Sequence, residues 1–181
     1  VLVTGCGDSR GLSGTVADGL AMANAKVTIQ SASGNVMDVG TTNGQGEYAG
    51  FSIPVSFQFP AILSVIRSDN NGVLRAIIPI KSGTVSTANI NPITEVITSQ
   101  LLPEGASLSS LDVGTGGDGF AQKAKNLVQV IFGNVIDYDA FASRNFKART
   151  KGNFTAGGLA DALIDTIAGI NAAKNPEDLL A

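Results

Sequence analysis

The hydrophobic pattern of this chain changes near Ile90, and no other feature constrains its fold as strongly. Before that point, short apolar runs are separated by Gly, Asn, Asp and Pro, and Val27 and Ile29 alternate with polar residues. A period of two is typical of a strand with one buried and one wet face. The pattern predicts strands over residues 12–17, 25–31, 36–42, 47–53, 61–68, 72–80 and 84–90.

After Ile90 the apolar residues recur at helical spacing. Pro92 suits the first turn of a helix, and the apolar residues from Ile93 to Leu101 share one face before Pro103 ends the segment. Similar stripes predict helices over 120–131 and 156–171, with a short helix within 137–146 and a wound stretch at 108–111. Thr94 and Glu95 are expected to stabilise the first turn of the helix that Pro92 begins.

We therefore predict an α+β fold, in which an N-terminal antiparallel β-sandwich is followed by a small C-terminal helical domain. The expected boundaries are 12–90 for the sandwich and 91–181 for the helical domain, with residues 1–11 as an N-terminal extension. Asp69, Asn70, Asn71 and Gly72 lie between two apolar runs and predict a hairpin turn. A calcium loop is disfavoured there, because the spaced carboxylates and terminal Glu are missing.

Composition narrows the classes of function. The chain has no histidine, which removes the usual general base near neutral pH and the commonest metal ligand. We therefore expect no enzyme activity, no metal and no cofactor. The formal net charge of -3 gives no electrostatic reason to bind nucleic acid. Charged residues make up only 15% of the chain and 22 residues are Gly, which suits short strands joined by many turns.

The only cysteine, Cys6, follows Val3, Thr4 and Gly5. This short run resembles the lipobox of bacterial lipoprotein precursors, in which small residues precede a cysteine that receives a lipid. A lipid on Cys6 would be the only membrane contact expected, because no run approaches the roughly 20 apolar residues of a spanning helix. The alternatives are an intermolecular disulfide through Cys6 or its packing as a small apolar side chain.

Three segments of the first half carry a family resemblance: residues 12–18 (LSGTVAD), 23–29 (ANAKVTI) and 41–48 (TTNGQGEY). Together they resemble the carboxypeptidase regulatory-like, transthyretin-like family, which implies a transthyretin-like or Ig-like β-sandwich. Within the third segment, Gly46 is expected to relieve a tight corner, and Tyr48 to bury its ring and hydrogen-bond through its hydroxyl.

Two later segments, 89–95 (NINPITE) and 154–165 (FTAGGLADALID), resemble the helical part of bacterial surface lipoproteins that carry such sandwiches. The resemblance implies a location at the cell surface or outside the cell, or in the outer membrane or periplasm if Cys6 is lipidated. It implies location and architecture more than activity.

Several other patterns have a structural and a functional interpretation. Residues 114–119 match G-x-G-x-x-G, but no clear strand of a βαβ unit precedes them, so a loop is favoured over a dinucleotide site. Asp161 and Asp165 lie one helical turn apart, which would suit paired-carboxylate chemistry in a cleft, although we favour a solvated helix face. The aromatic residues Phe51, Phe57 and Phe59 form either an exposed apolar patch or, as favoured, core or subunit interface.

Arg144, Lys147, Arg149 and Lys151 form the one marked charge cluster. They are candidates for contact with an acidic surface of a neighbouring subunit, an anionic glycan or a lipid headgroup. The simpler interpretation, which we favour, is a solvated linker before the last helix.

Two functions from different classes follow. The first is a non-enzymatic structural or adhesion protein of the cell envelope or extracellular space, in which Val1, Leu2, Val3 and Thr4 pair with the sheet edge of another copy. Repeated head to tail, that contact gives a filament, a homo-polymer or an assembly with other envelope proteins. The alternative is a lipid-anchored surface protein that binds a glycan or a partner protein.

Overall fold

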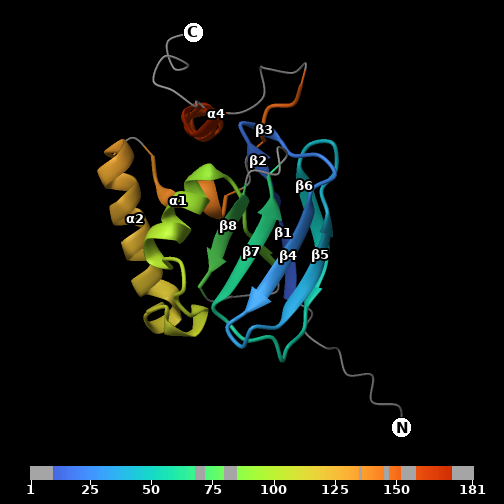
Figure 1. Cartoon of the computed structure of the whole chain (residues 1–181), viewed down its shortest axis with the longest axis vertical. Coiled ribbons are helices and arrows are strands. Elements are labelled where there is room, and N and C mark those ends of the chain that lie inside the picture. Colours follow the sequence, from blue (N-terminus) through green and yellow to red (C-terminus); the bar gives the residue numbers. More distant parts are fainter. Residues whose placement is uncertain are drawn as a thin grey trace.

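The computed structural model describes residues 10–67, 72–79, 85–134, 136–144, 147–151 and 158–172, and it confirms the mixed α+β class (Figure 1). The strands are β1 (Arg10–Thr15), β2 (Ala17–Asp18), β3 (Leu20–Ala21), β4 (Lys26–Ser31), β5 (Val36–Thr41), β6 (Glu47–Ile53), β7 (Ala61–Ile66), β8 (Val73–Ile78) and β9 (Val85–Thr87). The helices are α1 (Pro92–Leu101), α2 (Asp118–Phe132), α3 (Tyr138–Ala142) and α4 (Leu159–Ala172), with short 3-10 turns at Leu108–Ser110 and Thr115–Gly117.

The longer strands form two sheets. A four-stranded sheet is antiparallel throughout, in the order β5-β4-β7-β8. A three-stranded sheet has the order β6-β1-β9, with β6 antiparallel and β9 parallel to β1. The expectation of purely antiparallel pairing is therefore wrong for β9. The chain leaves β8 in one sheet and enters β9 in the other, and such a crossover allows parallel pairing where a hairpin would not.

Both sheets contribute side chains to one buried cluster. Val27 and Ile29 of β4 are fully buried while Lys26 and Gln30 are exposed, so the predicted alternation is confirmed. The main residues of the cluster are Leu12, Val16, Tyr48 and Ile53 from the first sheet and its flanks, and Leu63, Val65 and Leu74 from the second. Phe57 is buried, and Phe51 and Phe59 pack against the same cluster, so the core interpretation of these aromatics is confirmed.

Helix α1 covers the other face of the four-stranded sheet beside β8, α2 packs on α1, and α4 lies at the end of the molecule near β2 and β3 (Figure 1). Ile62 of β7 and Ile77 of β8 pair across the strands and project into a second buried cluster. There they meet Ile93 and Ile97 of α1, followed by Phe120, Ala124 and Val128 of α2 and Ile164 of α4. The helical half thus buries its apolar stripes against the sheet as well as within itself.

The glycine-rich stretch before α2 has a packing explanation. A Cβ on Gly114 would lie 2.5 Å from the backbone nitrogen of Gly119, and Gly114 has a φ of +67°. Backbone amides of Gly119 and Phe120 donate to the carbonyl of Val113, so the chain folds back tightly at the start of the helix. The two glycines allow that close approach, which explains their spacing without a nucleotide.

Candidate functional site

Some predicted site residues lie outside the described part of the chain. These are Cys6, the segment Val1 to Thr4, and Asp69, Asn70 and Asn71 of the expected hairpin turn. The strands that flank the turn, β7 and β8, do pair antiparallel over six residue pairs from Ala61↔Ile78 to Ile66↔Val73.

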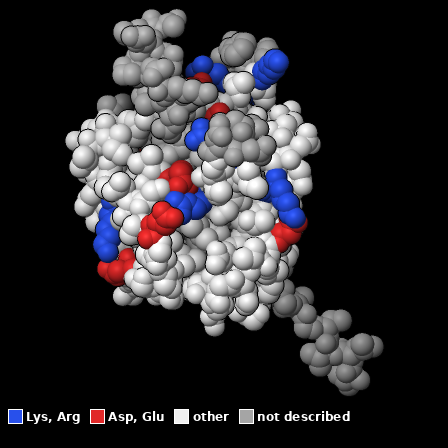
Figure 2. Space-filling view, viewed as in Figure 1, with Lys and Arg blue, Asp and Glu red and all other residues white. Residues whose placement is uncertain are grey.

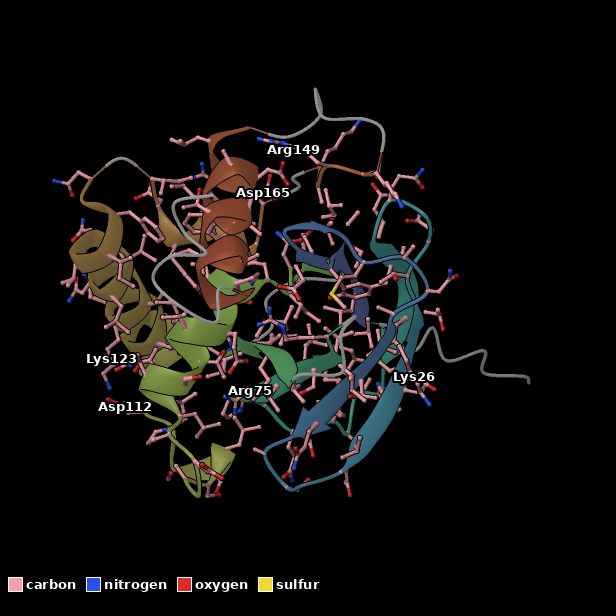
Figure 3. All side chains as sticks on the ribbon, turned by 45° about the horizontal axis from the view of Figure 1, so that its top comes forward. Lys26, Arg75, Asp112, Lys123, Arg149 and Asp165 are labelled. Carbon is pink, nitrogen blue, oxygen red and sulfur yellow. The ribbon has the colours of Figure 1, made fainter. Side chains whose placement is uncertain are left out.

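Arg149, Asp161 and Asp165 form what we call the charged clamp, where α4 crosses the segment that contains Arg149 (Figure 3). Arg149 Nε lies 3.0 Å from Asp161 Oδ2, and its Nη1 lies 3.2 Å from Asp165 Oδ2. The backbone nitrogen of Arg149 also donates to Asp161 Oδ1 over 3.3 Å. The carbonyl of Arg149 accepts from the backbone of Ala21, so the clamp joins α4 to β3.

The clamp corrects the expectation that Asp161 and Asp165 lie on a solvated face. Asp161 is only 1% exposed and Asp165 is half-buried. Burial, and then the charge of Asp165, raise the pKa of Asp161 above its ordinary value, while contacts with Arg149 oppose the shift. Burial likewise raises the pKa of Asp165, against the charge of Arg149. The two carboxylates hold one guanidinium, so the arrangement suits attachment of a helix more than proton transfer.

The clamp also divides the predicted basic run. Arg149 turns inward to the two aspartates, whereas Arg144, Lys147 and Lys151 have exposed side chains. The solvated interpretation therefore holds for these three residues and is wrong for Arg149. The two aspartates that pair with Arg149 lie twelve and sixteen residues further along the chain, on α4. No local sequence pattern predicts such a contact.

A second ion pair fixes α1 to the sheet. The guanidinium of Arg75 on β8 donates to both carboxylate oxygens of Glu95, and Ser99 hydrogen-bonds to both residues. Glu95 was expected only to stabilise the first helical turn, and its main partner is this arginine, which lies across the boundary between sheet and helix. Figure 2 shows the same tendency on the face drawn, where blue and red atoms lie mostly side by side on an otherwise white surface.

Two fully buried asparagines join the sheets to the helices. Asn89 accepts from the backbone of Thr15 on β1 and donates to the carbonyl of Arg144. Asn91 caps α1 by accepting from the backbone nitrogens of Ile93 and Thr94, and its amide nitrogen donates to the carbonyl of Phe141. The role of Thr94 in the first turn is confirmed, because its hydroxyl completes the capping box. We call these two residues the asparagine joint. The sequence analysis identified their segment by its family resemblance and did not predict that they link the sheets to the helices.

The sheet edges differ in how they are protected. Along β5, Asp38 pairs with Lys26 and a register shift lies at Val27/Thr28, both of which discourage further pairing. The β6 edge has a register shift between Tyr48 and Phe51, but it carries no charge at the exposed small residues Ala49, Gly50 and Ser52. In the described residues β6 pairs only with β1, so its other side is an open edge.

Two features of the described residues bear on membrane and metal binding. No described helix has the length and apolar character needed to cross a bilayer. Within the same part of the chain, no three acidic or cysteine side chains converge in a way that would hold a metal ion.

Comparison of the chain with protein-family models, with curated proteins and with solved structures gives no match.

Proposed function

We propose that this chain is a non-enzymatic structural or adhesion protein of the cell envelope or extracellular space. In this proposal the two sheets form a transthyretin-like or Ig-like sandwich, as the resemblance of residues 12–48 to the carboxypeptidase regulatory-like family suggests. The cluster shared by both sheets supports this interpretation. The helical part braces one face of the sandwich through the charged clamp, the Arg75–Glu95 pair and the asparagine joint.

The observation that carries the proposal is the open edge of β6. Edge strands of stable monomers commonly carry charges or distortions that prevent pairing. Strand β6 does have a register shift between Tyr48 and Phe51, with a positive φ at Gly50, but its residues from Ala49 to Ser52 are uncharged. The β-prone segment Val1 to Thr4 has the same length as that stretch. Strand addition between copies would then join subunits in a head-to-tail manner, which extends into a filament when the rotation does not close.

The absence of catalysis is part of the proposal. Asp161 and Asp165 were the acids with a spacing suited to paired-carboxylate chemistry, and both face Arg149. A carboxylate that is 1% exposed and ion-paired serves to hold α4 in place, and it offers little access to a substrate.

The test is the native mass and negative-stain appearance of four forms of the protein. We expect the full chain to form polymers, and deletion of residues 1–6 or the substitution Ala49→Lys to give monomers. Thr41→Lys on β5 is the matched control, since Thr41 is exposed on the edge that is already protected. Monomers in every form would overturn the filament.

A second candidate is a lipid-anchored surface protein that binds a glycan or a protein. It is favoured by the exposed side chains of Arg144, Lys147 and Lys151 near the start of α4. Its test is mass spectrometry of Cys6 in material from a bacterial envelope. A lipid on the cysteine supports the anchor, and a free thiol or disulfide rejects it.

A further inference from the structure

The turn between β5 and β6 contains an Asn–Gly pair, Asn43 and Gly44, that none of the roles described above explains. Both residues are exposed. A Cβ built on Gly44 would have no heavy atom within 4 Å, so packing does not require a glycine at this position. The missing side chain leaves the backbone nitrogen of Gly44 sterically accessible.

The side chain of Asn43 is folded back over the turn. Its Oδ1 accepts from the backbone nitrogens of Gln45 and Glu47, each over 2.9 Å. Its Nδ2 donates to the carboxylate of Glu47 over 3.1 Å. Because both partner residues follow Asn43 in the chain, these three bonds hold its Cγ over the segment that begins with Gly44.

The backbone nitrogen of Gly44 differs from its neighbours, which all donate hydrogen bonds. Asn43 donates to the carbonyl of Glu47, Gly46 donates to the carbonyl of Asn43, and Gln45 donates to the Asn43 side chain. Within the described part of the chain, the N–H of Gly44 donates to no acceptor. This nitrogen is therefore the nucleophile nearest in sequence to the Asn43 amide, and a bond between it and Cγ closes a five-membered ring.

The two amides that bond to Oδ1 also suit the charge that such an attack creates. When a nitrogen adds to the amide carbon, the negative charge develops on Oδ1. Fixed donors at about 2.7–3.1 Å from such an oxygen stabilise the transition state. The backbone nitrogens of Gln45 and Glu47 lie at 2.9 Å, so the turn holds the electrophile, the nucleophile and the charge-stabilising donors together.

We propose that Asn43 is a site of spontaneous modification, at which the turn converts its own asparagine to aspartate and isoaspartate. The nitrogen of Gly44 loses its proton to solvent and forms a bond to Cγ of Asn43. The bond from Cγ to Nδ2 then breaks, and the amide nitrogen leaves as ammonia after taking a proton from solvent. Water adds to either carbonyl of the resulting succinimide and opens the ring. The sum is the hydrolysis of one amide by one water.

Both products disturb the turn that joins the two sheets. Each introduces a carboxylate where the Nδ2 of Asn43 had donated to the carboxylate of Glu47, so an attraction becomes a repulsion. The isoaspartate product also adds a methylene to the main chain. That extra atom displaces the two backbone bonds that close the turn, from Asn43 to Glu47 and from Gly46 to Asn43.

The experiment is tryptic peptide mapping by mass spectrometry of the full chain, incubated at neutral pH in buffer and in guanidinium chloride. Peptides 27–67 and 68–75 separate Asn43 from the second Asn–Gly pair of the sequence, at residues 71–72. In denaturant the two pairs should react at similar rates. In the folded chain Asn43 should react about three- to tenfold faster than in denaturant, because the two hydrogen bonds to Oδ1 are then in place.

Gly44→Ala is the test variant. The added methyl group restricts the approach of the backbone nitrogen to Cγ and should slow the reaction at Asn43 by about tenfold. Gly158→Ala is the matched control, since Gly158 is also exposed and has no heavy atom within 4 Å of a Cβ. It should leave the rate at Asn43 unchanged, and circular dichroism establishes that both variants are folded.

Two outcomes would overturn the proposal. One is a rate at Asn43 in the folded chain that does not exceed the rate in denaturant. The other is an equal rate at Asn43 in the Gly44→Ala and Gly158→Ala variants. Both are measured from peptide masses, so they are separate from the assembly test, which concerns polymers formed through residues 1–6 and β6.

Discussion

At the scale of single residues, the contact between Gly14 and Ala88 is the tightest point of the first sheet. A Cβ on Gly14 would lie 1.9 Å from the carbonyl oxygen of Ala88 and 2.9 Å from the hydroxyl of Tyr48. The same hydroxyl donates to the carbonyl of Ala88, so one phenol links β6 to the segment after β9. The burial and hydrogen bond predicted for Tyr48 are thereby confirmed.

Gly14→Ala should destabilise the protein by about 3 kcal/mol or more, because the backbone must shift and the Tyr48 bond is disturbed. Gly44→Ala is the control, since nothing lies within 4 Å of a Cβ built there. The control should change the free energy of unfolding by less than about 0.5 kcal/mol. Urea denaturation of both variants makes the comparison, and equal effects would contradict the packing argument.

Sequence reasoning reached some residues and not others. Gly46 was expected at a tight corner, and its φ of +73° with the carbonyl of Val16 only 2.4 Å from a Cβ confirms this. Asp161 was placed wrongly, although a signal existed. It precedes the buried residues Ile164 and Ala168 by three and seven positions, and this spacing puts all of them on one helix face. Asp161 was assigned to the solvated face because it is charged, although its position on the helix predicts burial.

At the scale of elements, Asn91 stabilises the N-terminus of α1 as its N-cap residue. The Asn91 side chain accepts two backbone hydrogen bonds of the helix and donates one to the carbonyl of Phe141 beside α3. Removing it leaves three buried groups without this partner, in a helix whose Ile93 and Ile97 are fully packed.

Asn91→Ala should cost about 2–4 kcal/mol of unfolding free energy, from the lost cap and the unsatisfied carbonyl. Asn91→Asp keeps both cap bonds but places a carboxylate oxygen against the carbonyl of Phe141 at a fully buried position, so its cost should be at least as large. Ser107→Ala removes an exposed cap from a 3-10 turn and should cost about 1 kcal/mol or less. Thermal unfolding followed by circular dichroism checks the order. If Asn91→Ala lowers the unfolding free energy no more than Ser107→Ala does, Asn91 does not have this linking role.

The elements themselves were largely predictable, because periodicity is a local signal. The strand and helix patterns on either side of Ile90 placed β4, β6 and α1 within a few residues of their observed bounds. The pairing of strands and of charged residues was harder to predict from the sequence. The parallel β1–β9 contact and the Arg75–Glu95 pair both depend on where distant segments meet, and no spacing within a single segment encodes that meeting.

At the scale of the whole molecule, the charged clamp makes stability depend on pH in an uncommon direction. The folded state raises the pKa of Asp161 above its ordinary value of 3.8, so the folded protein binds this proton more tightly than the unfolded chain. The contribution is fully present below the ordinary pKa and is lost as pH rises through the folded one. Its slope is at most about 1.4 kcal/mol per pH unit for one group.

We therefore expect the stability of the wild-type chain relative to Asp161→Asn to fall as pH is raised from about 4 to 7. Urea denaturation of both proteins across that range gives the difference. Asp38→Asn is the control with the opposite sign. A hydrogen bond from Lys26 lowers the pKa of Asp38, and the contribution of that residue is lost as pH falls. A flat or rising difference for Asp161 would contradict the assigned burial effect.

The parallel pairing of β1 with β9 has a consequence for the order of assembly during synthesis. Of the described strands, β1 is synthesised first, and it lies at the centre of its sheet between residues 47–53 and 85–87. The four strands of the other sheet are complete by Ile78 and pair only with one another. That sheet can form early, while β1 waits for β9 and the asparagines that follow it. Until residues 85–87 are synthesised, β1 has only β6 as a partner, and its other side is open to pairing with other chains.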